Sequence, residues 1–249
     1  MTECILKSPM KIEKTEAPAP AEICVRHLCK AYGETLACRD VDFIARSGTV
    51  TGLLGLNGAG KSTLLKILCG VQYATSGELS VCGETDSAAI RQLCSYVSEI
   101  PELDLSFTVK ETLWERRAMA LEQVRRAAAV LELEAVLGKK LRTLSKGYRQ
   151  RVALAKALAA DTQVLVLDEF SAGLDPAQIV RLREAIKEQA KEKIVILSTH
   201  RIEEALSLCG CIYILHKGSV AAHGSVEELL AEAGKQNLEE AFLCFTGMM

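Results

Sequence analysis

The chain has 249 residues, of which 49% are hydrophobic and 25% are charged, a balance that excludes a mainly disordered, collagen-like or coiled-coil protein. Thirty Lys and Arg against thirty-two Asp and Glu give a formal net charge of −2. This balance argues against nucleic acid as a partner and against direct adhesion to anionic lipid. No stretch reaches the roughly 18 apolar residues of a membrane span, so we expect no direct membrane insertion.

The chain opens with a segment that differs in composition from everything after it. Residues 1–21 mix Lys, Glu, Ala and Pro and are expected to form a flexible N-terminal tail. From Ile23 onward, short apolar runs alternate with helix-forming runs, which is typical of an α/β protein. The first half predicts strands at 23–32, 38–45, 50–54, 79–82 and 94–97, with helices at 61–69 and 88–93.

The middle of the chain loses its strand signals. Residues 101–143 are rich in Ala, Leu, Glu and Arg, which favour helices, and predict a helical subdomain inserted into the α/β core. Continuous apolar strands alternating with helices imply a largely parallel sheet covered on both faces. The second half predicts helices to about 160, from the N-cap Asp175, from the capping box at Ser225 and at 238–245, and strands at 164–167, 194–198, 212–215 and 219–222.

Ten cysteines are irregularly spaced, below the density of a disulfide scaffold. They are interpreted as reduced thiols of a cytosolic protein, most of them buried in strand- or helix-like runs. Cys209-Gly210-Cys211 is the one close pair, and it lacks the second pair or nearby His of a zinc site.

A glycine-rich motif follows the apolar run at 50–54. Its spacing is Gly-x4-Gly-Lys-Ser, the P-loop pattern, in which backbone amides and a helix N-terminus cradle phosphate oxygens. Lys61 would reach the terminal phosphates and Ser62 would ligate Mg²⁺. A glycine-rich structural turn is the alternative, but the flanking strand and helix favour the phosphate site, and the absence of an Asn-Lys-x-Asp reader favours adenine. The expected ATP-binding residues are Gly55, Leu56, Asn57, Gly58, Ala59, Gly60, Lys61, Ser62 and Thr63.

The apolar run at 164–167 ends in Asp168 and Glu169, two carboxylates at a strand tip. Asp168 is placed to hold Mg²⁺, directly or through water. Because side chains alternate along a strand, Glu169 is expected to point elsewhere and to orient or deprotonate an attacking water. A solvated acidic pair is the alternative.

A second helix N-terminus is predicted at Ser145, which precedes Lys146 and Gly147. One interpretation is that Ser145 serves only as a helix cap. The other is that this is a second anion-binding helix N-terminus, which approaches the terminal phosphate of a bound ATP. In a symmetric dimer, that helix would come from the other chain.

With these residues, the sequence resembles the ATP-binding subunit of an ABC transporter over about residues 22–233. The motifs stand in that family's order, from the P-loop through Glu99 at the glutamine-loop position, the signature at 144–150 and the Asp168-Glu169 strand to the D-loop at 171–175 and the switch histidine His200. The resemblance implies a RecA-like, mostly parallel sheet with an antiparallel β subdomain and an inserted helical subdomain. It divides the chain into an ABC ATPase domain at 22–236 and a short C-terminal helix at 237–249.

The resemblance also implies roles for single residues. Tyr32 resembles the aromatic residue that stacks on adenine, although by sequence it is equally a core tyrosine. His200 would contact the terminal phosphate and hold the attacking water together with Glu169, Asp175 would tie two subunits together, and Glu99 would join Ser62 and Asp168 around Mg²⁺. The signature residues that meet the ATP of the partner subunit would be Ser145, Lys146 and Gly147.

Three features depart from the family pattern. Glu99 replaces Gln; Lys146 and Tyr148 replace the first Gly and the Gln of the signature; and Phe170 replaces the Pro after Glu169. A carboxylate at position 99 still offers an oxygen to a metal but cannot donate a hydrogen bond when ionised. The signature form at 144–151 and Glu99 at the glutamine-loop position together resemble the subgroup that serves ABC-2-type and gliding-motility-type permeases.

The expected function is ATP binding and hydrolysis, with ATP and Mg²⁺ as cofactors, by a cytoplasmic subunit held at the inner face of the membrane through integral-membrane permease subunits. One P-loop and one signature per chain imply a head-to-tail homodimer, or a heterodimer with a like subunit. The alternatives are a soluble ABC-type ATPase acting in an assembly pathway without a permease, and a nucleotide-binding regulatory module with little turnover.

Overall fold

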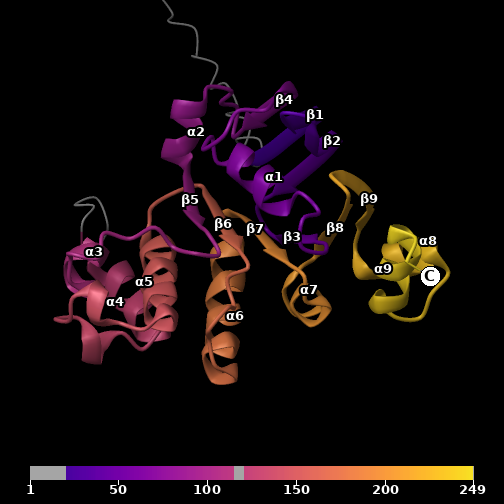
Figure 1. Cartoon of the computed structure of the whole chain (residues 1–249). Coiled ribbons are helices and arrows are strands. Elements are labelled where there is room, and N and C mark those ends of the chain that lie inside the picture. Colours follow the sequence, from indigo (N-terminus) through magenta and orange to yellow (C-terminus); the bar gives the residue numbers. More distant parts are fainter. Residues whose placement is uncertain (1–20, 115–120, 249) are drawn as a thin grey trace, which may run out of the picture.

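The computed structural model describes residues 21–114 and 121–248, so residues 1–20 of the expected N-terminal tail lie outside the described part. Two β-sheets form its framework (Figure 1). The antiparallel sheet has the order β2 (Thr35–Arg46), β1 (Glu22–Tyr32) and β4 (Ser76–Val81). The larger sheet has the order β5 (Cys94–Val97), β6 (Val164–Asp168), β7 (Ile194–Thr199), β3 (Val50–Leu54), β8 (Cys211–His216) and β9 (Ser219–Gly224).

The larger sheet is parallel from β5 to β8, and only β9 pairs antiparallel with its neighbour. This confirms the α/β fold with a mostly parallel sheet that the apolar runs predict. The helices are α1 (Lys61–Leu68), α2 (Ser87–Leu93), α3 (Val109–Trp114), α4 (Leu121–Val130), α5 (Lys146–Ala159), α6 (Pro176–Ala190), α7 (Ile202–Leu208), α8 (Val226–Ala233) and α9 (Leu238–Thr246), with 3₁₀ turns η1 (Glu134–Val136) and η2 (Leu141–Thr143).

The central strands β6 and β7 are buried on both faces, and their side chains alternate between two cores. Leu165 and Leu197 belong to a core with α4, α5 and α6, whereas Val166 and Ile196 belong to a core with α1 and the antiparallel sheet. Fully burying one such side chain contributes about 1.5–3 kcal/mol. Continuous apolar runs are therefore required here, and the alternating pattern of a half-exposed strand would not suffice.

The parallel register places the functional segments at one edge of the larger sheet. Leu54 at the end of β3 pairs with Thr199 at the end of β7, and Asp168 at the end of β6 pairs with Ser198. The residues that follow β3, β6 and β7 therefore emerge side by side. The P-loop, Glu169 and His200 come together for this reason.

Helices α3 and α4 pack against α5, on the far side of β5 and β6 from β3 and α1 (Figure 1). Among the described residues of 101–143, Val124, Ala127 and Leu131 are buried in the core that α5 completes. Within residues 21–114 and 121–248, no helix combines the length and the apolar content that crossing a membrane would require.

The predicted helix caps are confirmed. Ser145 accepts a hydrogen bond from the amide of Tyr148, and both Asp175 and Ser225 form capping boxes, with Pro176 at the first position after Asp175. The expectation of mostly buried thiols is wrong in part. Cys38 and Cys69 are buried, but four others are only half-buried: Cys24, Cys29, Cys82 and Cys94.

Candidate active site

The P-loop turns sharply between β3 and α1. Gly58 and Gly60 have φ angles of +80° and +104°, in the left-handed region that glycine adopts without strain. A Cβ at Gly60 would also collide with the carbonyl oxygen of Ala37, so no larger side chain fits there without movement. The amide of Gly55 donates to the carbonyl of Thr199 at 3.3 Å, which ties the start of the loop to the end of β7.

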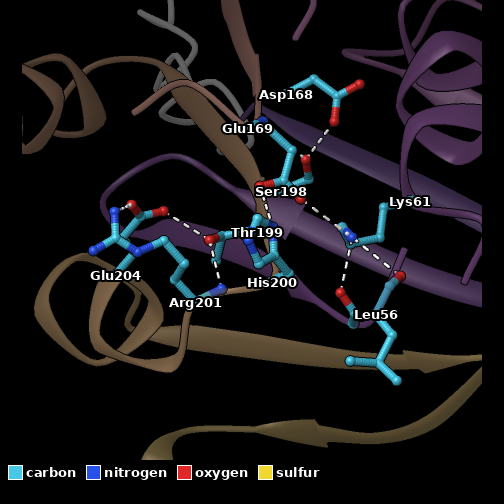
Figure 2. Close-up of polar contacts among 10 residues, drawn as sticks. Leu56, Lys61, Asp168, Glu169, Ser198, Thr199, His200, Arg201 and Glu204 are labelled. Carbon is cyan, nitrogen blue, oxygen red and sulfur yellow. Dashed lines mark hydrogen bonds and ion pairs between the residues drawn. The ribbon is translucent and has the colours of Figure 1, made fainter. Parts of the chain in front are cut away.

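Lys61 is the first residue of α1, and its side chain is only 5% exposed. Its ammonium group donates to the carbonyl oxygens of Gly55 at 2.8 Å and Leu56 at 3.3 Å. The Nζ atom also lies 3.2 Å from Oε1 of Glu169, a contact that has the distance of an ion pair but not the angles of a hydrogen bond (Figure 2). The P-loop lysine thus contacts oxygens of both the loop and the β6 end.

Glu169 lies just beyond the end of β6 and has a φ angle of +49°. This left-handed turn, rather than the alternation of side chains along a strand, directs its carboxylate, which corrects the reasoning from the sequence. Its amide donates to the carbonyl oxygen of Ser198 at 3.2 Å, which holds the turn. Its Oε2 lies 2.8 Å from Nδ1 of His200, while Oε1 accepts no hydrogen bond from any residue that the structure describes.

Asp168 is 2% exposed and accepts hydrogen bonds through both carboxylate oxygens. Oδ2 accepts from the hydroxyl of Tyr96 at 3.1 Å. Oδ1 accepts from the hydroxyl of Ser198, a contact that Figure 2 shows. Burial, and then the charge of Asp168, raises the pKa of Tyr96 well above its usual range, so the phenol remains a donor. Neither partner was predicted from the sequence, because both contacts depend on the order of strands that are distant in the chain.

The metal expected beside a triphosphate fits the residues at this edge. Ser62, Asp168 and Glu99 line one cavity of about 710 Å³. Mg²⁺ in proteins is commonly bound by one or two carboxylates together with substrate phosphates, and it retains several waters. A hydroxyl and two carboxylates facing one space form such a ligand set, with Asp168 held in place by Tyr96 and Ser198.

A buried carboxylate fixes the loop that carries His200. Glu204, on α7, is completely buried and accepts from the hydroxyl of Thr199 at 2.7 Å and from the guanidinium of Arg201 at 3.1 Å (Figure 2). The amide of Arg201 donates back to Oγ1 of Thr199 at 2.9 Å. His200 therefore sits between two anchored residues. Sequence reasoning missed Glu204, because its helix position reveals nothing about burial against β7.

Tyr32 lies at the end of β1 and is 46% exposed, so it is not a core tyrosine. Its hydroxyl donates to Oε1 of Gln72 at 2.5 Å, and the ammonium of Lys30 lies 5.0 Å from the ring centroid. The ring is accessible to a planar group.

The expected signature residues lie at the start of α5, apart from the P-loop of the same chain. Ser145 is the N-cap, and Lys146 and Gly147 are the first two helical residues. Gly147 approaches the D-loop so closely that a Cβ would lie 2.8 Å from the carbonyl oxygen of Gly173. Asp175 caps α6 at the end of the same loop.

Phe170, which stands where the family pattern has Pro, is completely buried in the core that α4, α5 and α6 share. The side chain anchors the chain immediately after Glu169. Position 170 therefore supports the left-handed turn at Glu169 through packing.

The buried lysine, the glycine-rich turn and the strand-end carboxylates define a P-loop nucleoside triphosphatase. The sequence profile described as "ABC transporter" matches residues 38–172, and a profile described as "AAA domain, putative AbiEii toxin, Type IV TA system" matches residues 140–206. The chain belongs to the ABC transporter family, and it is an ATPase of the ABC class.

Curated relatives agree with this assignment. The chain is 37% identical over 221 residues to a "Nod factor export ATP-binding protein I" from Burkholderia orbicola (strain AU 1054), an alignment that covers 84% of this chain and 73% of the relative. A protein of the same name from Rhizobium johnstonii is 32% identical over 225 residues, covering 86% of this chain and 72% of the relative.

Solved structures share the fold. One described as "Structure of ATP binding subunit of ABC transporter" matches with a TM-score of 0.84 and 29% identity, covering 90% of this chain and 99% of that one. A bacterial Atm1-family ABC exporter with ATP bound matches with a TM-score of 0.78 and 19% identity, covering 90% and 42% of the two chains, and shows the fold alone.

Proposed function

We propose that this chain is the ATP-hydrolysing subunit of an ABC exporter and that two copies close head to tail on two Mg-ATP. The observation that carries the proposal is the convergence of Lys61, Asp168, Glu169 and His200 at the carboxyl edge of β3, β6 and β7. Export is supported by the curated relatives, which are named as export ATP-binding proteins.

Each residue of the site has a role in this proposal. When bound, Mg²⁺ neutralises phosphate charge and aligns the transferred group. The P-loop amides and Lys61 bind the phosphates, and Ser62, Asp168 and Glu99 hold the metal ion. Tyr32 offers its exposed ring to adenine.

The hydrolytic step belongs to Glu169. Its Oε1 is buried against Lys61 at 3.2 Å and would accept a proton from water once a phosphate draws the lysine away, while His200 lies 2.8 Å from Oε2. A carboxylate held by a positioned histidine can orient water and accept its proton. His200 in turn is half-exposed, so it can also reach the terminal phosphate.

Dimerisation completes the site, because each chain has one P-loop and one signature. In the folded chain, Ser145 caps α5 and Lys146 and Gly147 begin it, and α5 packs against α3 and α4. The P-loop follows β3, which β6 and β7 separate from β5 in the sheet. The helix N-terminus and the exposed Lys146 would add positive potential beside the phosphates of the partner subunit. Asp175, at the end of the D-loop, would contact the partner.

A permease surface is supported by exposed apolar side chains around the cavity that contains Glu99. Ile100 is 68% exposed and Val71 is 52% exposed, and both line this cavity. Tyr73 and Phe107 are also exposed and stand close to these two residues in the sequence. An apolar rim of this kind fits a helix-bearing loop of a membrane protein. The permease would hold the subunit at the inner face of the membrane, and Lys146, Tyr148 and Glu99 favour a permease of the ABC-2 or gliding-motility type.

A photo-crosslinking amino acid in place of Ile100 tests the permease surface. The chain is expressed in its own host, and the membrane protein that co-purifies with it is examined for crosslinks. We expect a crosslink from position 100 and none from Val180, which is 57% exposed on α6. Equal crosslinking from both positions, or none from position 100 in a complex that co-purifies, would contradict the proposed surface.

A further inference from the structure

One side chain connects the helix that begins with the signature to the helix that follows the D-loop. Glu132 lies just after α4, between the buried residues Leu131 and Leu133. Its Oε1 accepts from Nη2 of Arg181 at 2.5 Å, and its Oε2 accepts from Nε2 of Gln178 at 3.2 Å. Both donors belong to α6, the helix that Asp175 caps (Figure 1).

The same carboxylate also faces α5. Nη1 of Arg151 lies 3.7 Å from Oε2 of Glu132 and donates to the carbonyl of Leu131 at 3.3 Å. The guanidinium of Arg151 is stacked 3.8 Å from the ring centroid of Tyr148, the third residue of α5. Arg151 is 7% exposed, and among the described residues Glu132 is an acidic side chain within ion-pair distance of its guanidinium.

Gln178 carries the connection to the D-loop. The side-chain oxygen of Gln178 accepts from the backbone amide of Asp175 at 3.3 Å, and the backbone amide of Gln178 donates to the carboxylate of Asp175 at 2.9 Å. A second contact runs in parallel at the backbone, where Gly147 lies against the carbonyl of Gly173. The signature turn and the D-loop are therefore joined at two places within one chain.

We propose that Glu132 is a positioning residue that fixes the D-loop to the signature turn, so that both meet the partner subunit as one rigid surface. The inference rests on the proposed head-to-tail dimer. Glu132 would touch neither nucleotide nor metal. It acts through Gln178 on Asp175 and through Arg151 on Tyr148.

The backbone at Glu132 offers a clean way to remove the carboxylate. Its φ angle is +52°, a conformation that glycine adopts without strain. Glu132→Gly therefore deletes the side chain while relaxing the turn, and Glu132→Gln removes only the charge. Glu134→Gln, at an exposed position two residues further on, is the matched control.

Hydrogen exchange of the monomeric chain tests the connection directly. In Glu132→Gly, we expect faster exchange at 145–148 and at 172–175 together, with unchanged exchange in the P-loop at 55–62. Unchanged exchange at 172–175 would overturn the proposal whatever the dimer does.

Dimerisation and turnover test the consequence. In a Glu169→Gln background, we expect Glu132→Gly to raise about tenfold the protein concentration at which half of the chains are dimeric with Mg-ATP, a change within the range of coupling between sites. In the wild-type background, we expect Glu132→Gly to lower kcat by about tenfold. Mg-ADP affinity stays the same, Glu132→Gln shows a smaller effect, and Glu134→Gln shows none. Normal dimerisation and kcat in Glu132→Gly would overturn the inference, whereas a Glu169→Gln parent that never dimerises would overturn the proposed function itself.

Discussion

Lys61 and Glu169 form a nearly buried ion pair of 3.2 Å that joins the P-loop to the end of β6. The lysine expected to bind phosphate and the carboxylate expected to activate water thus neutralise each other's charge in this structure. His200 holds the other carboxylate oxygen at 2.8 Å. In the proposed function a bound triphosphate would compete with Glu169 for Lys61, so that phosphate binding would free the Glu169 carboxylate.

This competition predicts tighter binding when the carboxylate is removed. Glu169→Gln is expected to raise Mg-ATP affinity severalfold, because Lys61 loses its charged partner and one negative charge leaves the phosphate site. Titration calorimetry at protein concentrations too low for dimers measures the effect, with Lys61→Ala as the control that removes binding. Weaker binding by Glu169→Gln would show that the pair does not compete with nucleotide.

Glu99→Gln should be tolerated. Both side chains present an oxygen to the cavity that Ser62 and Asp168 share, and Mg²⁺ requires only an oxygen ligand. We expect kcat within about threefold of wild type, whereas Glu99→Ala should need more Mg²⁺ for half-maximal rate. Total loss of turnover in Glu99→Gln would show that the negative charge has a role of its own.

Gly147→Ala should impair turnover, because its Cβ would lie 2.8 Å from the carbonyl of Gly173 and would separate the signature turn from the D-loop. We expect kcat to fall by about tenfold or more, because small displacements of the residues that position a reacting group commonly cost this much in rate. Gly138→Ala is the matched control, since a Cβ there meets nothing within 4 Å. Steady-state ATPase assays compare the two variants, and equal activities would count against a functional contact at Gly147.

Thr199→Val should weaken the loop that carries His200. The change keeps the side-chain shape but removes the hydroxyl that donates to Glu204 and accepts from the amide of Arg201. Leaving buried polar groups unpaired costs about 1–3 kcal/mol, so the free energy of unfolding should fall by that amount in urea titrations. Thr143→Val, on the exposed turn η2, serves as control, and similar losses in both variants would contradict the specific role of Thr199.

The thiols should differ in reactivity. Burial raises the pKa of Cys38 to about 11 and that of Cys209 to about 12, so both remain protonated at pH 8 and react slowly, because the thiolate is the nucleophile. Cys244 is exposed on α9. Alkylation of the native chain at pH 8, followed by mass spectrometry, should modify Cys244 well before Cys38 or Cys209, and rapid modification of Cys38 would contradict its burial.

Much of the fold could be predicted from local patterns. The buried strands β3, β6 and β7 follow from continuous apolar runs, and the caps at Ser145, Asp175 and Ser225 follow from residues one turn apart. The P-loop is equally local, because its glycines, lysine and serine are consecutive. Such signals depend on neighbours within one strand or one helical turn.

The remaining features depend on how distant segments meet. Tyr96 reaches Asp168 only because β5 pairs with β6, and Lys61 reaches Glu169 only because the backbone turns left-handed just after β6. Glu132 contacts α5 and α6 through a similar turn. No periodicity in the sequence encodes these turns, since Glu is not a residue that favours positive φ.

The mass of the Glu169→Gln chain in solution, measured by light scattering with and without Mg-ATP, shows whether two chains close on the nucleotide. We expect a mass twice that of one chain with Mg-ATP, and the mass of one chain with EDTA or when Lys61→Ala is added to Glu169→Gln. A Glu169→Gln chain that binds Mg-ATP and still has the mass of one chain at every concentration tested would contradict the composite site.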